Sequence, residues 1–279
     1  MDRRQTPFSG RVADPSLRGQ IEAETFAAPE PFSVSGNPFL HAKPGGARDR
    51  QLLTGDQVAL YDRQDGWAFV QAARDGYCGW LLETALCAPL EASHSVAVRT
   101  TWLHPTASVR QPALADLHLG AKVRLLGAED GVWSEAEVAG QRGWLPTQHL
   151  RPLSETASDP VSVARLFLGT PYIWAGNTGF GIDCSGLAQA ALLACGIACP
   201  GDSDQQEQAF GPALSEDEPN LPGDLYFWNG HVAMVADPQT LIHATGAFMQ
   251  VVLEPIAEAI PRIAAQGNPV TSRRRPLRG

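Results

Sequence analysis

The pattern of hydrophobic and polar residues changes near residue 152 of the chain. Between about 34 and 152, short stretches of alternating apolar and polar residues are separated by Gly and Asp, which is typical of small antiparallel barrels. After Pro160 the pattern predicts a short helix over 160–168, a turn, a second helix that begins near Cys184, and then strands over 224–228, 231–236, 241–244 and 250–253. Helices followed by a series of strands predict an α+β domain.

An internal repeat lies within the strand-rich half. Residues 53–60 align with residues 118–125 and share a glycine, a valine and a final leucine. Asp65-Gly66-Trp67 corresponds to Asp130-Gly131-Val132-Trp133, and Gly79-Trp80-Leu81 corresponds to Gly143-Trp144-Leu145. The repeat predicts two barrels of about 60 residues each. We expect Trp67, Trp80, Trp133 and Trp144 to pack in the barrel cores, because small barrels need large apolar side chains.

These patterns divide the chain into four parts. Residues 1–33 are rich in Pro, Glu and Ala without periodicity and are expected to form an extended arm. The first barrel is expected over 34–90, the second over 91–152, and the α+β domain over 153–279. Within this last domain the polar stretch 200–220 is expected to be a loop or a short helix.

Composition and charge narrow the class of protein. A chain of 279 residues with 44% hydrophobic and 18% charged residues is long and apolar enough for more than one folded core. The formal net charge of −9 argues against nucleic acid or an anionic membrane as a partner. The four arginines 273, 274, 275 and 278 are therefore interpreted as a solvated terminus.

Cellular location is predicted from the cysteines and from the start of the chain. No stretch has the 18 or more apolar residues of a membrane span, and the first residues lack the apolar region of a secretory signal. The number of cysteines is odd, at five, which fits a reducing compartment. We therefore expect a cytoplasmic protein. Cys195 and Cys199 are expected to be buried structural residues.

Candidate chemistry centres on Cys184. Cys184 lies at the start of a predicted helix. The positive end of the helix dipole there favours the thiolate over the thiol. His231 and His243 follow in strand-like stretches, which is the order needed for a nucleophile, a base and an orienting group. This arrangement predicts a cysteine peptidase. Taken singly, a buried cysteine is more often an apolar filler and a strand histidine more often structural.

A zinc site built from Cys184, His231 and His243 is the alternative chemistry for these residues. The chain lacks the closely spaced ligand pairs of zinc motifs, so we expect neither a metal nor another cofactor.

The last domain resembles the NlpC-type cell-wall cysteine peptidases, a papain-like family. The resemblance lies in the segments 170–176, 181–187, 221–228, 230–235 and 242–244. Ala175 departs from it, because the family has a second glycine there, but alanine is small and should be tolerated. The two repeats resemble bacterial SH3-like domains. Together the resemblances imply an α+β papain-like catalytic domain preceded by two small all-β SH3-like barrels.

The resemblance also implies roles for individual residues. Cys184 would be the nucleophile, His231 the general base and acid, and His243 the group that orients His231. The backbone N–H of Cys184 and the hydroxyl of Tyr172 would stabilise the oxyanion.

The implied substrate is a peptide derived from peptidoglycan. Family members cleave the γ-D-glutamyl–diamino acid bond of stem peptides, and relatives with two SH3-like domains recycle peptides with a free N-terminal L-alanine. Asp183 would pair with that ammonium group with help from Ser185, and Tyr77 would close the pocket or else be a half-buried barrel residue. Asp49 and Asp56 are further candidate acidic contacts. The alternatives are a hydrolase of the intact wall, an inactive wall-binding protein, and an acyltransferase.

Overall fold

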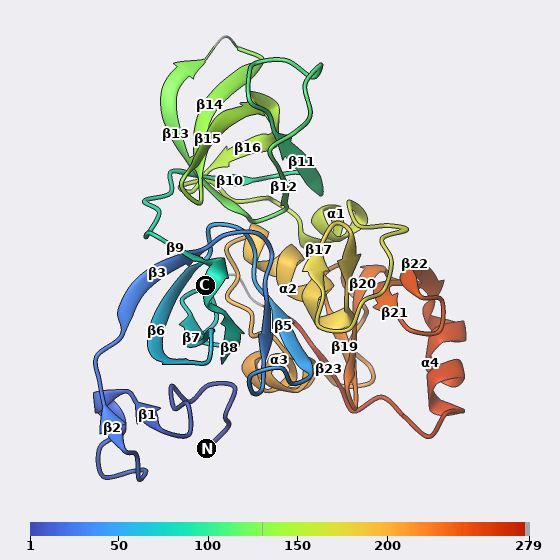
Figure 1. Cartoon of the computed structure of the whole chain (residues 1–279). Helices are drawn as coiled ribbons and strands as arrows, with labels where there is room; N and C mark the ends of the chain where they lie inside the picture. Colours follow the sequence, from blue (N-terminus) through green and yellow to red (C-terminus); the bar gives the residue numbers. More distant parts are fainter. Residues whose placement is uncertain (130, 277–279) are drawn as a thin grey trace. The chain divides into compact units, whose positions relative to one another are not determined.

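The computed structural model describes residues 1–129 and 131–276 (Figure 1). The chain divides into two compact units, residues 1–154 and residues 155–279, and each is described by itself. No helix in the described ranges is long and apolar enough to cross a membrane.

The first copy of the repeat forms an antiparallel sheet in the order β5-β4-β8-β7-β6-β3-β9. Its core is mostly aliphatic and includes Leu40, Val58, Val70 and Leu81, each almost fully buried. The strands are β3 (Glu30–Val34), β4 (Phe39–His41), β5 (Arg48–Gln51), β6 (Gln57–Gln64), β7 (Trp67–Ala72), β8 (Cys78–Leu82) and β9 (Leu86–Cys87), with a 3-10 turn at Glu83–Ala85.

The N-terminal arm is more structured than the sequence predicted. Strands β1 (Val12–Ala13) and β2 (Thr25–Phe26) pair in parallel, a 3-10 turn spans Pro15–Leu17, and β3 already begins at Glu30, before the expected boundary at 34. Several polar contacts attach the arm to the barrel, among them an ion pair of 2.5 Å between Arg11 and Asp62 and a hydrogen bond of 3.1 Å from the Tyr61 hydroxyl to Asp14. These polar contacts, rather than an apolar pattern, order the arm.

The second copy forms its own sheet, in the order β15-β14-β13-β10-β16, beside the pair β11–β12. Its core is again aliphatic, with Leu103, Leu117, Val123 and Leu145 buried. The strands are β10 (His94–Val96), β11 (Thr100–Leu103), β12 (Ala115–His118), β13 (Lys122–Glu129), β14 (Trp133–Val138), β15 (Gln141–Pro146) and β16 (Leu150–Pro152), with a 3-10 turn at Thr147–His149.

The two copies share local geometry at the positions that the repeat aligned. Gly55 and Gly120 both have positive φ, +81° and +91°, and a side chain at Gly55 would lie 2.4 Å from a backbone oxygen of Lys122. Each copy also places a histidine edge-on to the tryptophan that follows its Asp-Gly sequence, with ring centroids 5.1 Å apart in the first copy (His41–Trp67) and 5.2 Å in the second (His104–Trp133).

The predicted packing of the tryptophans is confirmed in the first copy and wrong in the second. Trp80 is buried in a cluster with Phe69 and Cys78, and the half-buried Trp67 packs against that cluster. Trp133 and Trp144 are only half-buried, because leucine and valine fill the core of the second copy. Asp130, part of the predicted turn in the second copy, lies outside the described residues.

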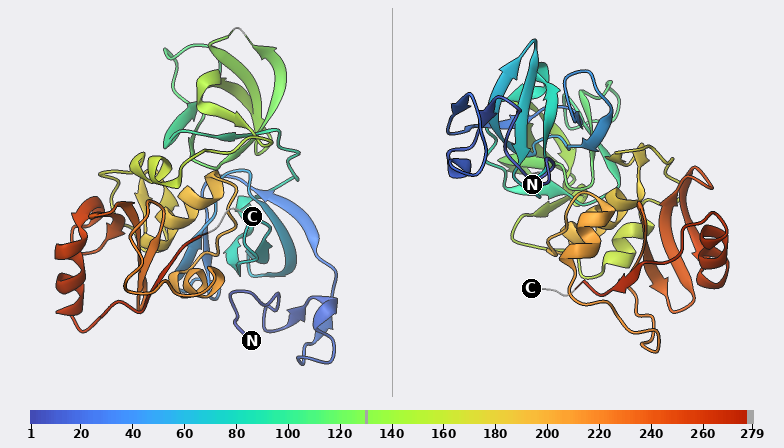
Figure 2. Two further views of the ribbon diagram at one scale, coloured as in Figure 1. Left: turned by 180° about the vertical axis from the view of Figure 1, so that it is seen from behind. Right: turned by 90° about the horizontal axis from the view of Figure 1, so that it is seen from below.

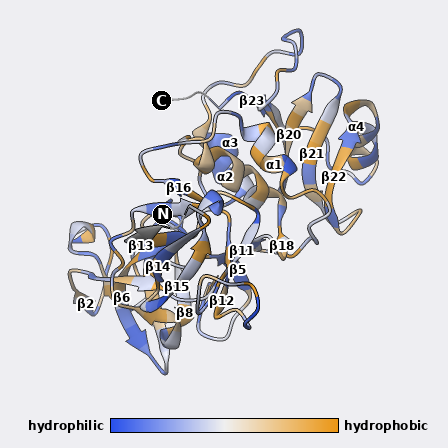
Figure 3. Cartoon of the chain, turned by 90° about the horizontal axis from the view of Figure 1, so that it is seen from above, coloured by the Kyte–Doolittle hydropathy of each residue, from blue (hydrophilic) through white to orange (hydrophobic). Residues whose placement is uncertain are grey.

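The second unit is an antiparallel sheet between helices (Figures 1 and 2). Helices α1 and α2 pack on β20 and β21, and α4 packs on β21 and β22. Apolar residues concentrate along these strands (Figure 3). The helices are α1 (Pro160–Arg165), α2 (Cys184–Ala194), α3 (Ser203–Ala209) and α4 (Ile256–Ala264); the strands are β17 (Asn177–Thr178), β18 (Gly181–Ile182), β19 (Leu225–Trp228), β20 (His231–Asp237), β21 (Thr240–Thr245), β22 (Gln250–Pro255) and β23 (Ser272–Arg274).

The elements predicted for this unit are all present, with shifted ends. The first helix ends at Arg165, three residues early, and the chain turns at Gly169, whose φ is +77°. Strand β22 continues two residues past the expected end, to Pro255. Cys195 and Cys199 are buried, as predicted.

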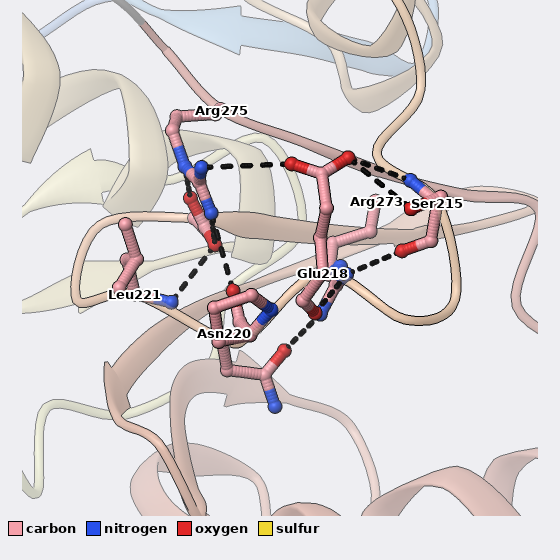
Figure 4. Close-up of polar contacts among 8 residues, drawn as sticks. Ser215, Glu218, Asn220, Leu221, Arg273 and Arg275 are labelled. Carbon is pink, nitrogen blue, oxygen red and sulfur yellow. Dashed lines mark hydrogen bonds and ion pairs between the residues drawn. The ribbon is translucent and has the colours of Figure 1, made fainter.

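The interpretation of the C-terminal arginines as a solvated terminus is wrong for the described ones. Strand β23 pairs with β19, and the Arg273 guanidinium donates to the backbone oxygens of Ser215 and Glu218 at 2.7 and 2.6 Å (Figure 4). Arg275 forms two bonds with the Asp224 carboxylate, at 2.7 and 2.8 Å. The spacing of charges in the sequence does not show whether an arginine binds other parts of the protein or faces water. Arg278 lies outside the described residues.

Candidate active site

Cys184 is the first residue of α2, and Asp183 is its N-cap. Asp183 Oδ1 accepts hydrogen bonds from the Gly186 N–H at 2.6 Å and from the Ser185 hydroxyl at 3.1 Å. An aspartate cap satisfies one of the free N–H groups in the first helical turn. The capping interaction therefore fixes where the helix begins and, with it, the position of the thiol.

Close packing fixes the residue two positions after Cys184. A side-chain carbon at Gly186 would lie 2.5 Å from the backbone oxygen of Gly176 and 3.0 Å from Asp183 Oδ1. Only glycine allows this approach. Gly186 is therefore required for α2 to pack closely against the preceding loop.

The electrostatic surroundings of the Cys184 thiol differ from the expectation. Burial, and after it the Asp183 charge, raise the pKa of Cys184 to about 12, although hydrogen bonds from the backbone N–H groups of Val232, Ser185 and Cys184 act in the opposite direction. The helix start alone was expected to favour the thiolate. Desolvation of a buried charge outweighs a helix dipole worth about 1 kcal/mol.

A line of four hydrogen-bonded side chains runs from β20 to α4. His231 Nε2 lies 2.9 Å from His243 Nδ1, and His243 Nε2 lies 2.9 Å from Glu254 Oε2. Glu254 accepts two further bonds of 2.7 Å from the Nε and Nη2 atoms of Arg262. We call these four residues the relay. His243 is fully buried, so its two ring nitrogens depend on these partners.

Both imidazoles of the relay favour the neutral form. Burial, followed by the charges of His243 and Arg262, lowers the pKa of His231 to about 3. Burial also lowers the pKa of His243, and the Glu254 carboxylate opposes that change without cancelling it. The Trp228 ring lies 5.4 Å from the His231 ring and restricts its orientation.

Tyr172 lies near the cysteine as well. Burial, and then the charges of Cys184 and Asp183, raise the pKa of its phenol, so the hydroxyl keeps its proton and is able to donate. The backbone N–H of Tyr172 donates to Met249 at 2.9 Å and connects this segment to the turn between β21 and β22.

Most of the residues predicted for the site belong to the second unit and lie on adjoining elements. Asp183, Cys184 and Ser185 form the start of α2; α2 packs on β20, where the Val232 N–H next to His231 binds the thiol. His231 and His243 contact each other directly.

Tyr77 and the two candidate acidic residues lie in the first unit. Tyr77 is not half-buried: its ring is part of the aliphatic core of the first copy, with 1% of its surface exposed. Asp49 is paired with Arg3 at 2.7 Å, and Asp56 with Arg74 at 3.0 Å. Both carboxylates thus have partners within their own unit.

Glu254 and Arg262 were not found from the sequence. The predicted strand ended at residue 253, one residue before Glu254, and Arg262 is one of two charged residues on a short helix. The register that pairs His243 with Val252 places Glu254 two residues further along the same face. The available signal for Glu254 was its place directly after the strand predicted over 250–253, which is the next strand after His243. Over residues 1–129 and 131–276, no group of three His, Cys, Asp or Glu side chains is arranged to hold a metal ion.

Two sequence families match parts of the chain. Residues 169–263 match the NlpC/P60 family, and residues 40–86 match the bacterial dipeptidyl-peptidase Sh3 domain. The resemblance seen in the sequence is thereby confirmed for the last domain and for the first copy of the repeat. The matched Sh3 region does not include the second copy.

Similar proteins span most of the chain. It is 28% identical over 239 residues to a γ-D-glutamyl-L-lysine dipeptidyl-peptidase of Bacillus cereus, covering 75% of this chain and 70% of the relative. A Bacillus subtilis protein of the same name is 30% identical over 192 residues, covering 64% of this chain and 63% of the relative. The fold is similar to that of an NlpC/P60 family protein from Bacillus cereus, with a TM-score of 0.76, 23% identity, and coverage of 89% of this chain and all of that one. The chain therefore contains an SH3-like domain followed by a papain-like domain of the NlpC/P60 family.

Proposed function

From this NlpC/P60 domain preceded by a bacterial SH3 domain, we propose a cysteine peptidase that hydrolyses the γ-D-glutamyl–diamino acid bond of peptidoglycan stem peptides with a free N-terminal L-alanine. The observation that carries the proposal is the hydrogen-bonded pair His231–His243 on strands that pack against the helix bearing Cys184.

The proposed reaction uses the thiol as nucleophile. His231 takes the proton of Cys184 as the sulfur attacks the amide carbonyl, and it then gives the proton to the leaving amine. The thioester that remains is hydrolysed by a water that His231 activates. A thiol with a pKa of about 12 and an imidazole with a pKa of about 3 make a neutral resting pair, so proton transfer accompanies attack and does not precede it. The Cys184 N–H and the Tyr172 hydroxyl would stabilise the oxyanion.

Asp183 is proposed to bind the ammonium group of the substrate while it caps α2. Its Oδ1 is engaged by Gly186 and Ser185, which holds the carboxylate in one orientation. The Asp183 charge raises the pKa of the Cys184 thiol. A bound ammonium group would offset that charge, so the correct substrate would itself make the thiol easier to ionise.

The first SH3 domain is proposed to narrow the substrate site, with Tyr77 as its contribution. The support is that the similar proteins are named dipeptidyl-peptidases and that residues 40–86 of this chain match the bacterial dipeptidyl-peptidase Sh3 domain. A dipeptidyl-peptidase needs a free N-terminus at a fixed distance from the cleaved bond. We propose that the enzyme acts in the recycling of wall peptides in the cytoplasm, where such peptides have a free N-terminus.

The test offers three substrates in parallel to the full chain: the free peptide L-Ala-γ-D-Glu-diamino acid, the same peptide acetylated at its N-terminus, and intact sacculi. Acetylation leaves the buried Asp183 without its charged partner, which costs several kcal/mol, on the order of a hundredfold or more in kcat/KM. We expect cleavage of the free peptide only, in forms with lysine and with diaminopimelate.

Three other results each contradict part of the proposal. Equal cleavage of the free and acetylated peptides contradicts the ammonium site. Cleavage of sacculi in preference to both indicates a hydrolase of the intact wall. Binding of sacculi by the protein with no cleavage of any substrate indicates a wall-binding protein. The Cys184→Ala protein is the control for contaminating peptidase.

A further inference from the structure

We propose that Glu254 and Arg262 are positioning residues that set the proton positions in His243 and His231 and so leave Nδ1 of His231 as the ring nitrogen that accepts a proton. The inference deepens the proposed function and rests on it for the role of His231. It follows from the order of hydrogen bonds in the relay.

The proton positions can be assigned from the outer end of the relay inward. An ionised carboxylate only accepts hydrogen bonds, so the 2.9 Å contact with Glu254 requires the proton of His243 to be on Nε2. In the neutral ring Nδ1 then has a lone pair, and the 2.9 Å contact with it requires a proton on Nε2 of His231. Nδ1 of His231 is consequently left unprotonated. A single carboxylate thus determines the tautomer of both rings.

Arg262 keeps Glu254 in the accepting state. Burial opposes ionisation of Glu254, but hydrogen bonds from Arg262 and the charge of His243 hold its pKa below the usual range. The two parallel bonds of 2.7 Å use both carboxylate oxygens, which fixes the plane of the carboxylate. The guanidinium lies 5.4 Å from the Phe248 ring centroid, a further contact that holds it in place.

The pair acts through proton position more than through charge. Glu254 and Arg262 together are neutral, and the Arg262 charge lowers the pKa of His231. An amide at position 254 still offers an oxygen to His243 Nε2, whereas an apolar side chain offers none and leaves His243 free to protonate Nδ1. In that second tautomer the proton on His231 moves to Nδ1, and the base is lost.

The experiment compares Glu254→Gln, Glu254→Leu and Arg262→Leu in the full chain, with Glu258→Leu as the matched control. Glu258 is exposed in the first turn of α4 and carries the same charge as Glu254. Nitrogen-15 NMR of labelled histidine reports the tautomers, carboxymethylation of Cys184 by iodoacetate reports its reactivity, and peptide hydrolysis reports kcat and KM separately.

In the wild-type protein we expect both rings of the relay to be protonated at Nε2. Glu254→Gln should keep this tautomer and lose less than about tenfold in kcat. Glu254→Leu should shift His243 toward the Nδ1 tautomer, slow carboxymethylation, and lower kcat on the order of a hundredfold with little change in KM, since general base catalysis contributes 10²–10⁴. Arg262→Leu should fall between the two, and Glu258→Leu should change nothing.

A wild-type spectrum with a proton on Nδ1 of either ring overturns the inference without any variant, even if Glu254→Leu fails to fold. Equal kcat for wild type and a folded Glu254→Leu protein overturns it as well. Failure of the wild type to cleave the peptides refutes the proposed substrate, while the NMR and carboxymethylation results still decide the role of Glu254.

Discussion

The protein contains two clusters of buried charge, and they differ in what they are able to do. In the second unit, the relay connects the buried Glu254 carboxylate through two neutral imidazoles to β20, the strand whose Val232 N–H binds the Cys184 thiol. In the first unit Asp56 is paired with Arg74 at 3.0 Å and accepts the Leu53 N–H at 2.8 Å.

The cluster in the first unit also includes Lys122 from the second copy of the repeat. Burial lowers the pKa of Lys122, and Asp56 opposes that change. Together with Leu90 these residues line a cavity of about 260 Å³. In the second copy Ala121 occupies the position that aligns with Asp56, so a barrel of this kind does not need a carboxylate there.

The difference shows that buried charge does not by itself identify a catalytic site. Asp56, Arg74 and Lys122 are opposite charges held together by an ion pair and by burial, and such groups hold two segments together. The relay instead contains two neutral imidazoles, which can both accept and donate a proton, and its first histidine adjoins the Val232 N–H that binds the Cys184 thiol. We therefore expect changes in the relay to affect rate and changes in the first cluster to affect stability.

The largest expected effect is that of Cys184→Ala. It should reduce hydrolysis on the order of a thousandfold or more, because no other thiol replaces the nucleophile, while the free energy of unfolding stays close to that of wild type. His231→Ala should be similarly severe, and His243→Ala less so, because the proposed role of His243 is to orient His231 without taking part in the reaction. Peptide hydrolysis and urea unfolding are the measurements; a loss for His243→Ala equal to that for His231→Ala contradicts this division of roles.

Asp56→Ala should show the opposite behaviour. Removing the carboxylate leaves the half-buried Arg74 and Lys122 side by side without the negative charge between them, which should lower the free energy of unfolding of the first unit by about 3 kcal/mol. Urea unfolding followed by tryptophan fluorescence measures the change. Gln64→Ala, at an exposed position of the same sheet, is the control. A stability equal to that of the control would mean that the cluster is not a structural pair.

Tyr77 tests whether the two units share the substrate site. Because the ring is fully buried, Tyr77→Ala would open a cavity and destabilise the barrel, so Tyr77→Phe is the sharper variant. We expect it to lower kcat/KM for the free peptide about tenfold while the protein stays folded at the assay temperature, since only the hydroxyl is lost. The segment from residue 153 onward should cleave the same peptide poorly. Full activity of that isolated segment refutes a shared site.

The smallest expected effect concerns Ala175. It was expected to be tolerated because it is small, but its φ is +65°, in the left-handed region that favours glycine, and it is buried. Ala175→Gly should therefore remove backbone strain of about 1 kcal/mol. Part of this gain is offset because glycine also increases the entropy of the unfolded chain, so we expect a small net rise in the free energy of unfolding. Thermal unfolding measures the gain; a loss of stability would show that the methyl group packs favourably.

The sequence alone determined the order of elements and the main chemical groups. Alternation and the repeated glycines predicted the β-rich half, and the change to a longer period located the helix that begins at Cys184. These features are local: a turn, a capping residue or an apolar stripe is specified by a few neighbouring residues. For the same reason His231 and His243 were recognisable as a pair in strands.

Only the tertiary structure decided which partners the charged residues have. Glu254, Arg262, Arg273 and Asp56 look alike in the sequence as surface charges, yet each is paired with a group from another element. The raised pKa of Cys184 is likewise a result of burial, which no local pattern reports. Hydrogen-bond partners and desolvation depend on which elements pack together, so the tautomers of the two histidines are set by strand register and by the position of α4.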